Sequence, residues 1–110
     1  MKHESHRHVP SPLARGLDAI AHPWTVLILS AAFRGLTRFD QFERALGISP
    51  AMLTRRLSEL IQAGLLERRR YSTRPPRNEY VLSKQGRAFL PVLQSLQRWS
   101  ELCFPDPEAP

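Results

Sequence analysis

Apolar residues recur at helical spacing over most of the chain, and capping residues divide this pattern into separate helices. Ser11-Pro12 predicts the start of a first helix, because serine caps helix N-termini and proline is favoured at the first helical position. Pro23 starts a second helix, which runs to Gly35. Apolar residues surround the axis of this second helix, so it is predicted to be buried at the centre of the fold. Residues 39–46 predict a short third helix.

The fourth predicted helix has the clearest ends. Ser49 is its N-cap, Pro50 takes the first helical position, and Gly64 follows its last turn. Its apolar residues form one inward face, which consists of Leu53, Leu57, Leu60 and Ile61. Residues 39–64 therefore predict two helices joined by a short connection, which is the arrangement of a helix-turn-helix.

Beyond residue 64 the hydrophobic period changes from that of a helix to that of a strand. Residues 65–71 and 78–82 are strand-like, and residues 72–77 separate them, which predicts a hairpin with a long tip. Ser83 then caps a last helix over residues 84–103, which would be roughly 30 Å long at about 1.5 Å per residue. Pro91 lies inside this helix and is expected to bend or divide it. The order of elements predicts a mostly helical α+β fold, a winged helix-turn-helix with an additional N-terminal helix and a long C-terminal helix.

The chain has 110 residues, enough for one domain and too few for two. The domain is expected to span residues 11–104, with residues 1–10 as a disordered arm and the proline-rich residues 105–110 as a disordered tail. No apolar run approaches the roughly 20 residues of a membrane-spanning helix. The first ten residues lack the apolar stretch of a secretory signal, so a cytosolic protein without a membrane partner is expected.

The charge balance favours a nucleic-acid partner. Sixteen basic residues face ten acidic ones, and all basic residues except Lys2 and Lys84 are arginine. A guanidinium group binds phosphate or guanine through two parallel hydrogen bonds, whereas an ammonium group acts as a point charge. A GC-rich genome would also enrich arginine. The positions of the arginines along the chain therefore have to distinguish a nucleic-acid-binding surface from a compositional bias.

The polar face of the fourth helix has the composition of a surface that reads DNA. Ser49, Thr54, Arg55 and Ser58 are predicted to enter a major groove, where arginine reads guanine and small hydroxyl residues read several base edges. Arg56 at the border of this face is predicted to contact phosphate. The alternative is that this is only the solvated face of an amphipathic helix.

The predicted hairpin is rich in arginine. Five of the ten residues at 68–77 are arginine, and none is acidic. Arg74 and Arg77 are expected to project from the tip toward the minor groove or its flanking phosphates. Strand alternation is expected to turn Arg68 or Arg70 inward to pair with a glutamate of the hairpin.

The last helix has more apolar surface than one small core can bury. Its apolar residues cover well over half of its circumference, which predicts a dimerisation helix that packs with the first and last helices of a second copy. A symmetric dimer also matches a palindromic DNA site. The alternative is that the wide apolar face packs only within its own domain. The residues expected at the interface are Leu13, Leu17, Val92, Leu96, Trp99 and Leu102.

Other reactive side chains do not predict a catalytic or metal site. His3, His6 and His8 lie in the polar arm, where no fold would fix them as metal ligands. Cys103 is surrounded by apolar residues and is expected to be a buried, inert thiol. His22 is expected to cap or pack a helix. The sequence has no phosphate-binding glycine loop or metalloprotease motif, so neither an enzyme nor a cofactor is expected.

Three segments, residues 17–29, 38–69 and 71–99, resemble the HxlR-type helix-turn-helix regulators, which are bacterial winged-helix proteins. The most specific stretches are ISPAMLTRRLSEL at 48–60 and PPRNEYVLS at 75–83, followed by LPVL. The resemblance implies homodimers formed through the first and last helices, and control of transcription, often of an adjacent gene. Many members begin this domain with Cys-Pro, and in some that cysteine senses oxidants. Here the matching pair is Ser11-Pro12, so sensing by that route is not expected.

These patterns together predict a regulator that binds double-stranded DNA as a homodimer at a pseudo-palindromic operator, in the bacterial cytoplasm at the nucleoid. The alternative is a winged-helix protein-interaction module whose basic hairpin meets an acidic partner. The sequence points to no particular small-molecule effector.

Overall fold

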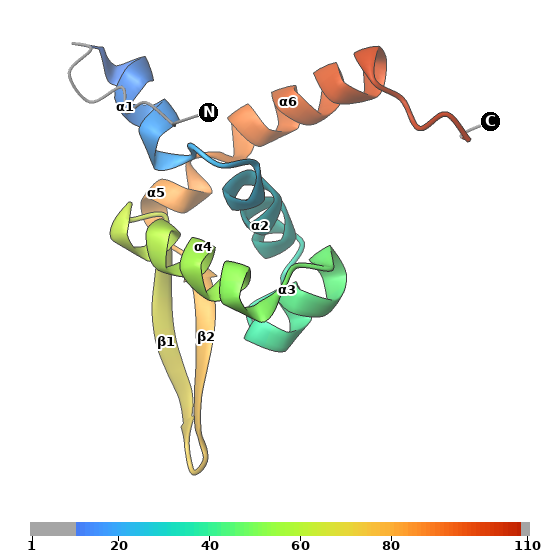
Figure 1. The fold of residues 1–110 in the computed structure, drawn as a ribbon. Helices are drawn as coiled ribbons and strands as arrows, with labels where there is room; N and C mark the ends of the chain where they lie inside the picture. Colours follow the sequence, from blue (N-terminus) through green and yellow to red (C-terminus); the bar gives the residue numbers. More distant parts are fainter. Residues whose placement is uncertain (1–10, 109–110) are drawn as a thin grey trace.

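The structure, a computed structural model, describes residues 11–108 and confirms the predicted order of elements (Figure 1). A body of helices carries one antiparallel hairpin, which projects away from it. The fold is the mostly helical winged helix-turn-helix that the sequence predicts. Its elements are α1 (Pro12–Ala19), α2 (Pro23–Phe33), α3 (Phe39–Leu46), α4 (Pro50–Gln62), β1 (Leu66–Thr73), β2 (Pro76–Leu82), α5 (Lys84–Arg87) and α6 (Leu90–Cys103).

Three helices begin at the serine caps that the sequence predicts. The hydroxyl oxygens of Ser11, Ser49 and Ser83 each accept a hydrogen bond from the backbone N–H three residues further on, at 3.0, 3.2 and 3.0 Å. Each bond satisfies an N–H group that has no partner within its helix. These caps set where α1, α4 and α5 start.

The end of α4 turns the chain sharply into the hairpin. Gly64 has a φ of +80°, a left-handed conformation that favours glycine. Its N–H donates to the carbonyl of Ile61, and the N–H of Leu65 donates to the carbonyl of Leu60, both at 3.0 Å. This pair of bonds is a Schellman ending, and it delivers the chain directly into β1.

The hydrophobic core lies between α2, α3, α4 and the base of the hairpin. The leucine stripe of α4, which consists of Leu53, Leu57 and Leu60, is at most 2% exposed and packs within one cluster with α2. Burial of this stripe turns the opposite face of α4 outward. The other buried members of the cluster are Ile28, Leu29, Ala31, Phe42, Ile48 and Leu66.

The hairpin has a shorter tip than the sequence predicts. Pairing runs from Leu66 opposite Leu82 to Thr73 opposite Pro76, so only Arg74 and Pro75 lie between the strands. The expectation of a long tip was wrong because it assigned the polar and proline residues 72–77 to the tip. An antiparallel ladder is held by backbone hydrogen bonds, which continue through polar residues.

The hairpin arginines do not pair with its glutamates as expected. Arg68 and Arg70 are exposed and make no ion pair within the part of the chain that the structure describes. The register explains this, because Glu79 lies opposite Arg69, and residues directly opposite each other share a face of the hairpin. Glu67 also lies on that face, while Arg68 and Arg70 lie on the other.

The last helix is divided, as Pro91 predicts. Residues 84–87 form α5, and α6 begins at Leu90, with the proline in its first turn. The 14 residues of α6 span about 21 Å, so the expected length of roughly 30 Å for residues 84–103 does not apply to α6 alone. A proline in the first turn needs no N–H partner, which is why the chain restarts its helix there.

The expectation that Cys103 is buried was also wrong. Cys103 is exposed at the C-terminal end of α6. Its apolar neighbours Leu102 and Phe104 are themselves 82% and 69% exposed, because this end of the helix extends beyond the core. Phe104 instead packs edge-on against Trp99, with ring centroids 5.3 Å apart.

The structure describes only part of the two terminal segments that were expected to be disordered. Residues 1–10, with the three arm histidines, and residues 109–110 lie outside the described residues. Residues 105–108 are exposed and form neither helix nor strand. Across residues 11–108 no single helix is long and apolar enough to cross a membrane, and α1 and α2 meet that test only when combined across an 80° bend.

The contact between α5 and the end of α4 predicts a sharp sensitivity to side-chain volume. Gly86 is buried, and a Cβ at this position would overlap the backbone carbonyl of Leu65. We expect Gly86→Ala to lower the free energy of unfolding by about 1–3 kcal/mol, as overpacking typically does. Urea unfolding followed by circular dichroism measures the change.

Gly16→Ala is the matched control, because Gly16 lies inside α1 with no atom near the added Cβ. It is expected to raise the free energy of unfolding by about 0.5–1 kcal/mol through its helix propensity. Equal stability of Gly86→Ala and the wild type would contradict the close approach of α5.

Candidate nucleic-acid interface

The predicted base-reading residues lie together on the outward face of α4. Thr54, Arg55 and Ser58 are all exposed, and they recur at the spacing of one helix face opposite the leucine stripe. The Arg55 side chain is 71% exposed. This face combines small hydroxyl residues with one long cationic side chain. The small residues let the helix backbone approach a polar surface closely, and the arginine can extend into a groove of that surface.

Ser49 lies at the N-terminal end of the same helix. Its hydroxyl oxygen accepts the N–H of Met52, so its hydroxyl hydrogen is available to a second acceptor. The N-terminus of a helix carries a partial positive charge, which favours phosphate. Ser49 is exposed and is therefore placed where a phosphate could approach.

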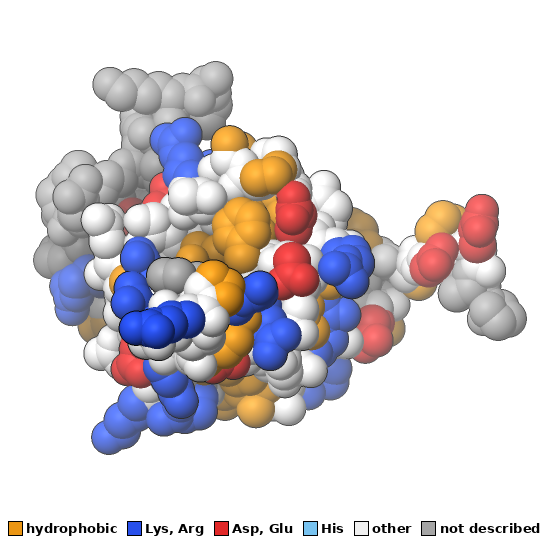
Figure 2. All heavy atoms as spheres, turned by 90° about the horizontal axis from the view of Figure 1, so that it is seen from below, with side chains coloured by type: hydrophobic (Ala, Val, Ile, Leu, Met, Phe, Trp, Pro, Cys, Tyr) orange, Lys and Arg blue, Asp and Glu red, His pale blue; other side chains and the backbone are white. Residues whose placement is uncertain are grey.

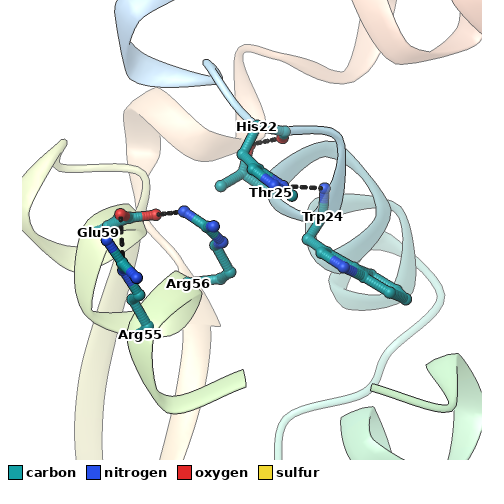
Figure 3. A network of polar contacts seen from close by, with 6 residues as sticks. All are labelled: His22, Trp24, Thr25, Arg55, Arg56 and Glu59. Carbon is teal, nitrogen blue, oxygen red and sulfur yellow. Dashed lines mark hydrogen bonds and ion pairs between the residues drawn. The ribbon is translucent and has the colours of Figure 1, made fainter. Parts of the chain in front are cut away.

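One carboxylate holds two arginines of α4. Glu59 accepts a hydrogen bond from Nη1 of Arg56 at 2.8 Å, and its other oxygen lies 3.9 Å from Nε of Arg55 (Figure 3). The Arg56 side chain is only 12% exposed, so Arg56 lies away from the face that carries Arg55. Its predicted phosphate contact stays a prediction, and in this geometry it would require Arg56 to leave Glu59. Glu59 follows Arg56 by three positions and Arg55 by four, which is the spacing of helical ion pairs, so the sequence carries a local signal for this contact.

The hairpin presents its arginines beside α4. β1 follows α4 directly and packs against it, and Arg74 and Arg77 are exposed at the tip. Figure 2, which views the molecule from the hairpin side, shows Lys and Arg side chains gathered around this projection. Arg68, Arg69 and Arg70 are exposed along the same hairpin, which makes it a basic surface on a molecule of net charge +6.

The base of the hairpin is tied to the start of α3 by contacts that the sequence analysis missed. The N–H of Tyr80 donates to the carbonyl of Thr37 at 2.7 Å, and the Thr37 hydroxyl donates to Glu79 at 3.0 Å. The guanidinium of Arg38 lies 4.8 Å from the centre of the Tyr71 ring, a cation–π contact. These contacts fix the hairpin relative to the helix-turn-helix. They join residues that are more than 30 positions apart in the sequence, so no local pattern could have indicated them.

His22 has the helix-capping role that the sequence predicts. Its Nδ1 accepts the N–H of Trp24 at 3.1 Å and so caps α2 (Figure 3). Within residues 11–108, no three side chains of His, Cys, Asp or Glu are placed to hold a metal ion.

A second surface, apolar in character, lies at the end of the molecule away from the hairpin tip, where α1 and α6 are found (Figure 1). Trp99 is 54% exposed there, although tryptophan is usually well covered. A shallow groove of about 640 Å³ runs along α6 between Pro91 and Trp99. Every residue predicted for the dimer interface is exposed in this single chain, namely Leu13, Leu17, Val92, Leu96, Trp99 and Leu102.

Comparisons with known proteins agree with this architecture. The model of the HxlR-like helix-turn-helix family matches residues 19–107. An uncharacterized HTH-type transcriptional regulator of Mycobacterium tuberculosis, Rv3095, is 40% identical over 106 residues, which are 96% of this chain and 67% of that protein. Among solved structures, PA1607, described as a candidate transcription factor, has a TM-score of 0.87 at 35% identity, over 97% of this chain and 75% of that one.

A redox regulator, HypR in its reduced form, is also similar. Its TM-score is 0.77 at 34% identity, and the match covers 83% of this chain and 91% of that one. The family match spans both the helix-turn-helix and the hairpin, and the sequence and structure comparisons agree on the class of protein. The chain therefore belongs to the HxlR-like helix-turn-helix family of winged-helix transcriptional regulators.

Proposed function

We propose that this chain acts as a homodimer that binds double-stranded DNA sequence-specifically at a pseudo-palindromic operator. The observation that supports this most is the pairing of an exposed hydroxyl-and-arginine face on α4 with an arginine-rich hairpin held rigidly beside it. A DNA duplex offers base edges in its major groove and phosphates on either side of that groove. Such a function belongs at the nucleoid in the cytoplasm.

In this proposal α4 enters the major groove. The groove is about 12 Å wide and admits one helix with small side chains on its contact face. Arg55 reads a guanine, while Thr54 and Ser58 contact neighbouring base edges. Ser49 and the first turn of α4 meet a flanking phosphate. Arg74 and Arg77 follow the minor groove or its phosphates, where they add affinity that depends little on sequence.

The proposed dimer forms through the apolar surface of α1 and α6. That surface includes Leu102 at 82% and Leu13 at 73% exposure, and a second copy would cover both. With a two-fold axis near α6, the α4 helix and the hairpin of each subunit would lie away from the dimer interface, where DNA can reach them. Two half-sites about 34–36 Å apart along the duplex, one helical turn, suit such a dimer.

Two arginine substitutions test the division of roles between α4 and the hairpin. We expect Arg55→Ala to cost roughly 1–3 kcal/mol of binding free energy at a cognate site and to relax the preference at one base position in each half-site. Arg74→Ala should weaken cognate and random DNA by similar factors. Fluorescence anisotropy with a site selected from a random pool, and with scrambled DNA, measures both.

The two variants control for each other, because each removes one exposed guanidinium. Equal losses on cognate and random DNA for Arg55→Ala would show that Arg55 contacts phosphate rather than a base. If selection from the random pool enriches no sequence, the specific DNA-binding role fails, and binding of the basic hairpin to an acidic protein becomes the better account.

A charge placed on the apolar surface tests the dimer. We expect Trp99→Glu to give a monomer, because burying an unpaired carboxylate at an interface costs several kcal/mol. Trp99 is about half exposed in one chain, so the fold itself should persist. Sedimentation velocity reports the oligomeric state, and Leu96→Glu should behave alike.

Gln94→Glu is the matched control, since Gln94 is exposed on α6 and lies opposite Trp99 around the helix. It should remain dimeric and retain operator affinity. A Trp99→Glu protein that stays dimeric would place the interface elsewhere.

A further inference from the structure

A cleft of about 810 Å³ separates α1 and the start of α2 from the C-terminal half of α4. Its volume lies within the range of pockets that hold small molecules, about 300–1,000 Å³. Neither the base-reading face nor the apolar surface accounts for it. Its walls carry three arginines, two acids and several alanines, and the residues that matter below are Arg15, Arg55, Arg56, Glu59, Ala21 and Ala63.

Arg56 lines this cleft and has a polar atom that is buried without a hydrogen-bond partner. Its side chain is 88% removed from solvent, as its 12% exposure shows, and its Nε is fully buried with no hydrogen-bond partner. A guanidinium has five N–H donors, and among residues 11–108 Glu59 is the one acceptor that they reach. A buried N–H without a partner costs about 1–3 kcal/mol, so an additional acceptor at this point would be favourable.

The charges around Arg56 specify the kind of acceptor. The lining has three arginines, Arg15, Arg55 and Arg56, and two acidic residues, so positive charges outnumber negative ones. Neither acidic residue is free, since Glu59 binds arginine and Asp18 also has an interaction partner. The alanines give the cleft an apolar component. This combination suits an anion with a compact apolar body, because a carboxylate pairs with a guanidinium through two parallel hydrogen bonds.

We propose that the cleft binds a small organic carboxylate, which takes the place of Glu59 at Arg56. Glu59 then turns fully to Arg55, from which it is already only 3.9 Å away. Because Arg55 is the proposed guanine reader, its neutralisation lowers operator affinity. The step is an exchange of ion-pair partners and involves no covalent change.

The position of the cleft is compatible with the proposed dimer. Arg15, Asp18 and Ala19 line the cleft from one side of α1, whereas Leu13 and Leu17 lie on the opposite side of that helix. The proposed interface therefore leaves the cleft open. Ligand binding to the cleft can be measured without DNA, so this part of the proposal does not depend on the proposed DNA-binding function. Only the predicted effect of the ligand on operator affinity rests on the proposed function.

Benzoate serves as the probe, with benzamide as its neutral counterpart of similar shape and inorganic phosphate as a simple anion. We expect benzoate to shift the Arg56 Nε–H signal in nitrogen-15 NMR spectra in a saturable manner, while benzamide and phosphate do not. Saturating benzoate should lower operator affinity severalfold in wild type. In Glu59→Gln benzoate should bind more tightly, because no carboxylate competes, and should no longer affect operator affinity.

Two variants locate the site independently. Arg56→Gln should weaken benzoate binding by about tenfold or more through loss of the charged pair. Ala21→Phe retains Arg56 but fills the exposed mouth of the cleft, so it keeps the test valid if Arg56→Gln fails to fold. Arg44→Gln and Ala45→Phe, both at exposed positions of α3, should bind benzoate like the wild type.

Several results would overturn the proposal. Absence of saturable benzoate binding, equal binding of benzamide or phosphate, or unchanged binding in Ala21→Phe would each exclude an organic-carboxylate site in this cleft. Unchanged operator affinity at saturating benzoate would exclude the exchange of Glu59 between the two arginines.

Discussion

Burial of the leucine stripe of α4 is the constraint on which the surface of this protein depends. Leu53, Leu57 and Leu60 each contribute about 1.5–3 kcal/mol when fully buried, so together they rival the 5–15 kcal/mol that holds a typical domain folded. A helix whose one face is held in the core by this much free energy cannot rotate about its axis, so its opposite face always points to solvent. The exposed positions of Thr54, Arg55 and Ser58 therefore follow from packing, and the chain can vary these residues to change what it reads without changing its fold.

Two polar devices refine the surface that packing creates. The contacts of Thr37 with Glu79 and Tyr80 fix the base of the hairpin, so the arginines at its tip have a defined position relative to α4. Glu59 forms an ion pair with the exposed Arg55 and a second, shorter one with the nearly buried Arg56. Exposed ion pairs contribute little to stability, but a carboxylate shared between an exposed and a buried arginine links the contact face to the cleft behind it.

Local signals in the sequence predict most of the fold, because serine caps, terminal glycines and the helical period act within a few residues. The same signals indicate the outward residues of α4 and the capping role of His22. They do not show how far a strand continues through polar residues, which is why the hairpin tip was predicted too long. They also do not show whether apolar neighbours are themselves covered, and Cys103 is exposed for that reason. The hairpin base and the cleft depend on contacts between distant segments.

The central claim is that the α4 face and the hairpin form one DNA-binding surface in each subunit of a dimer. Binding of the selected DNA site at increasing salt concentration tests this most directly. Each subunit is taken to neutralise about four phosphates through the hairpin arginines and the first turn of α4, so a dimer neutralises about eight. The logarithm of the binding constant should then fall against the logarithm of the salt concentration with a slope of about −7. A slope shallower than about −2 would contradict a phosphate-based interface of this size.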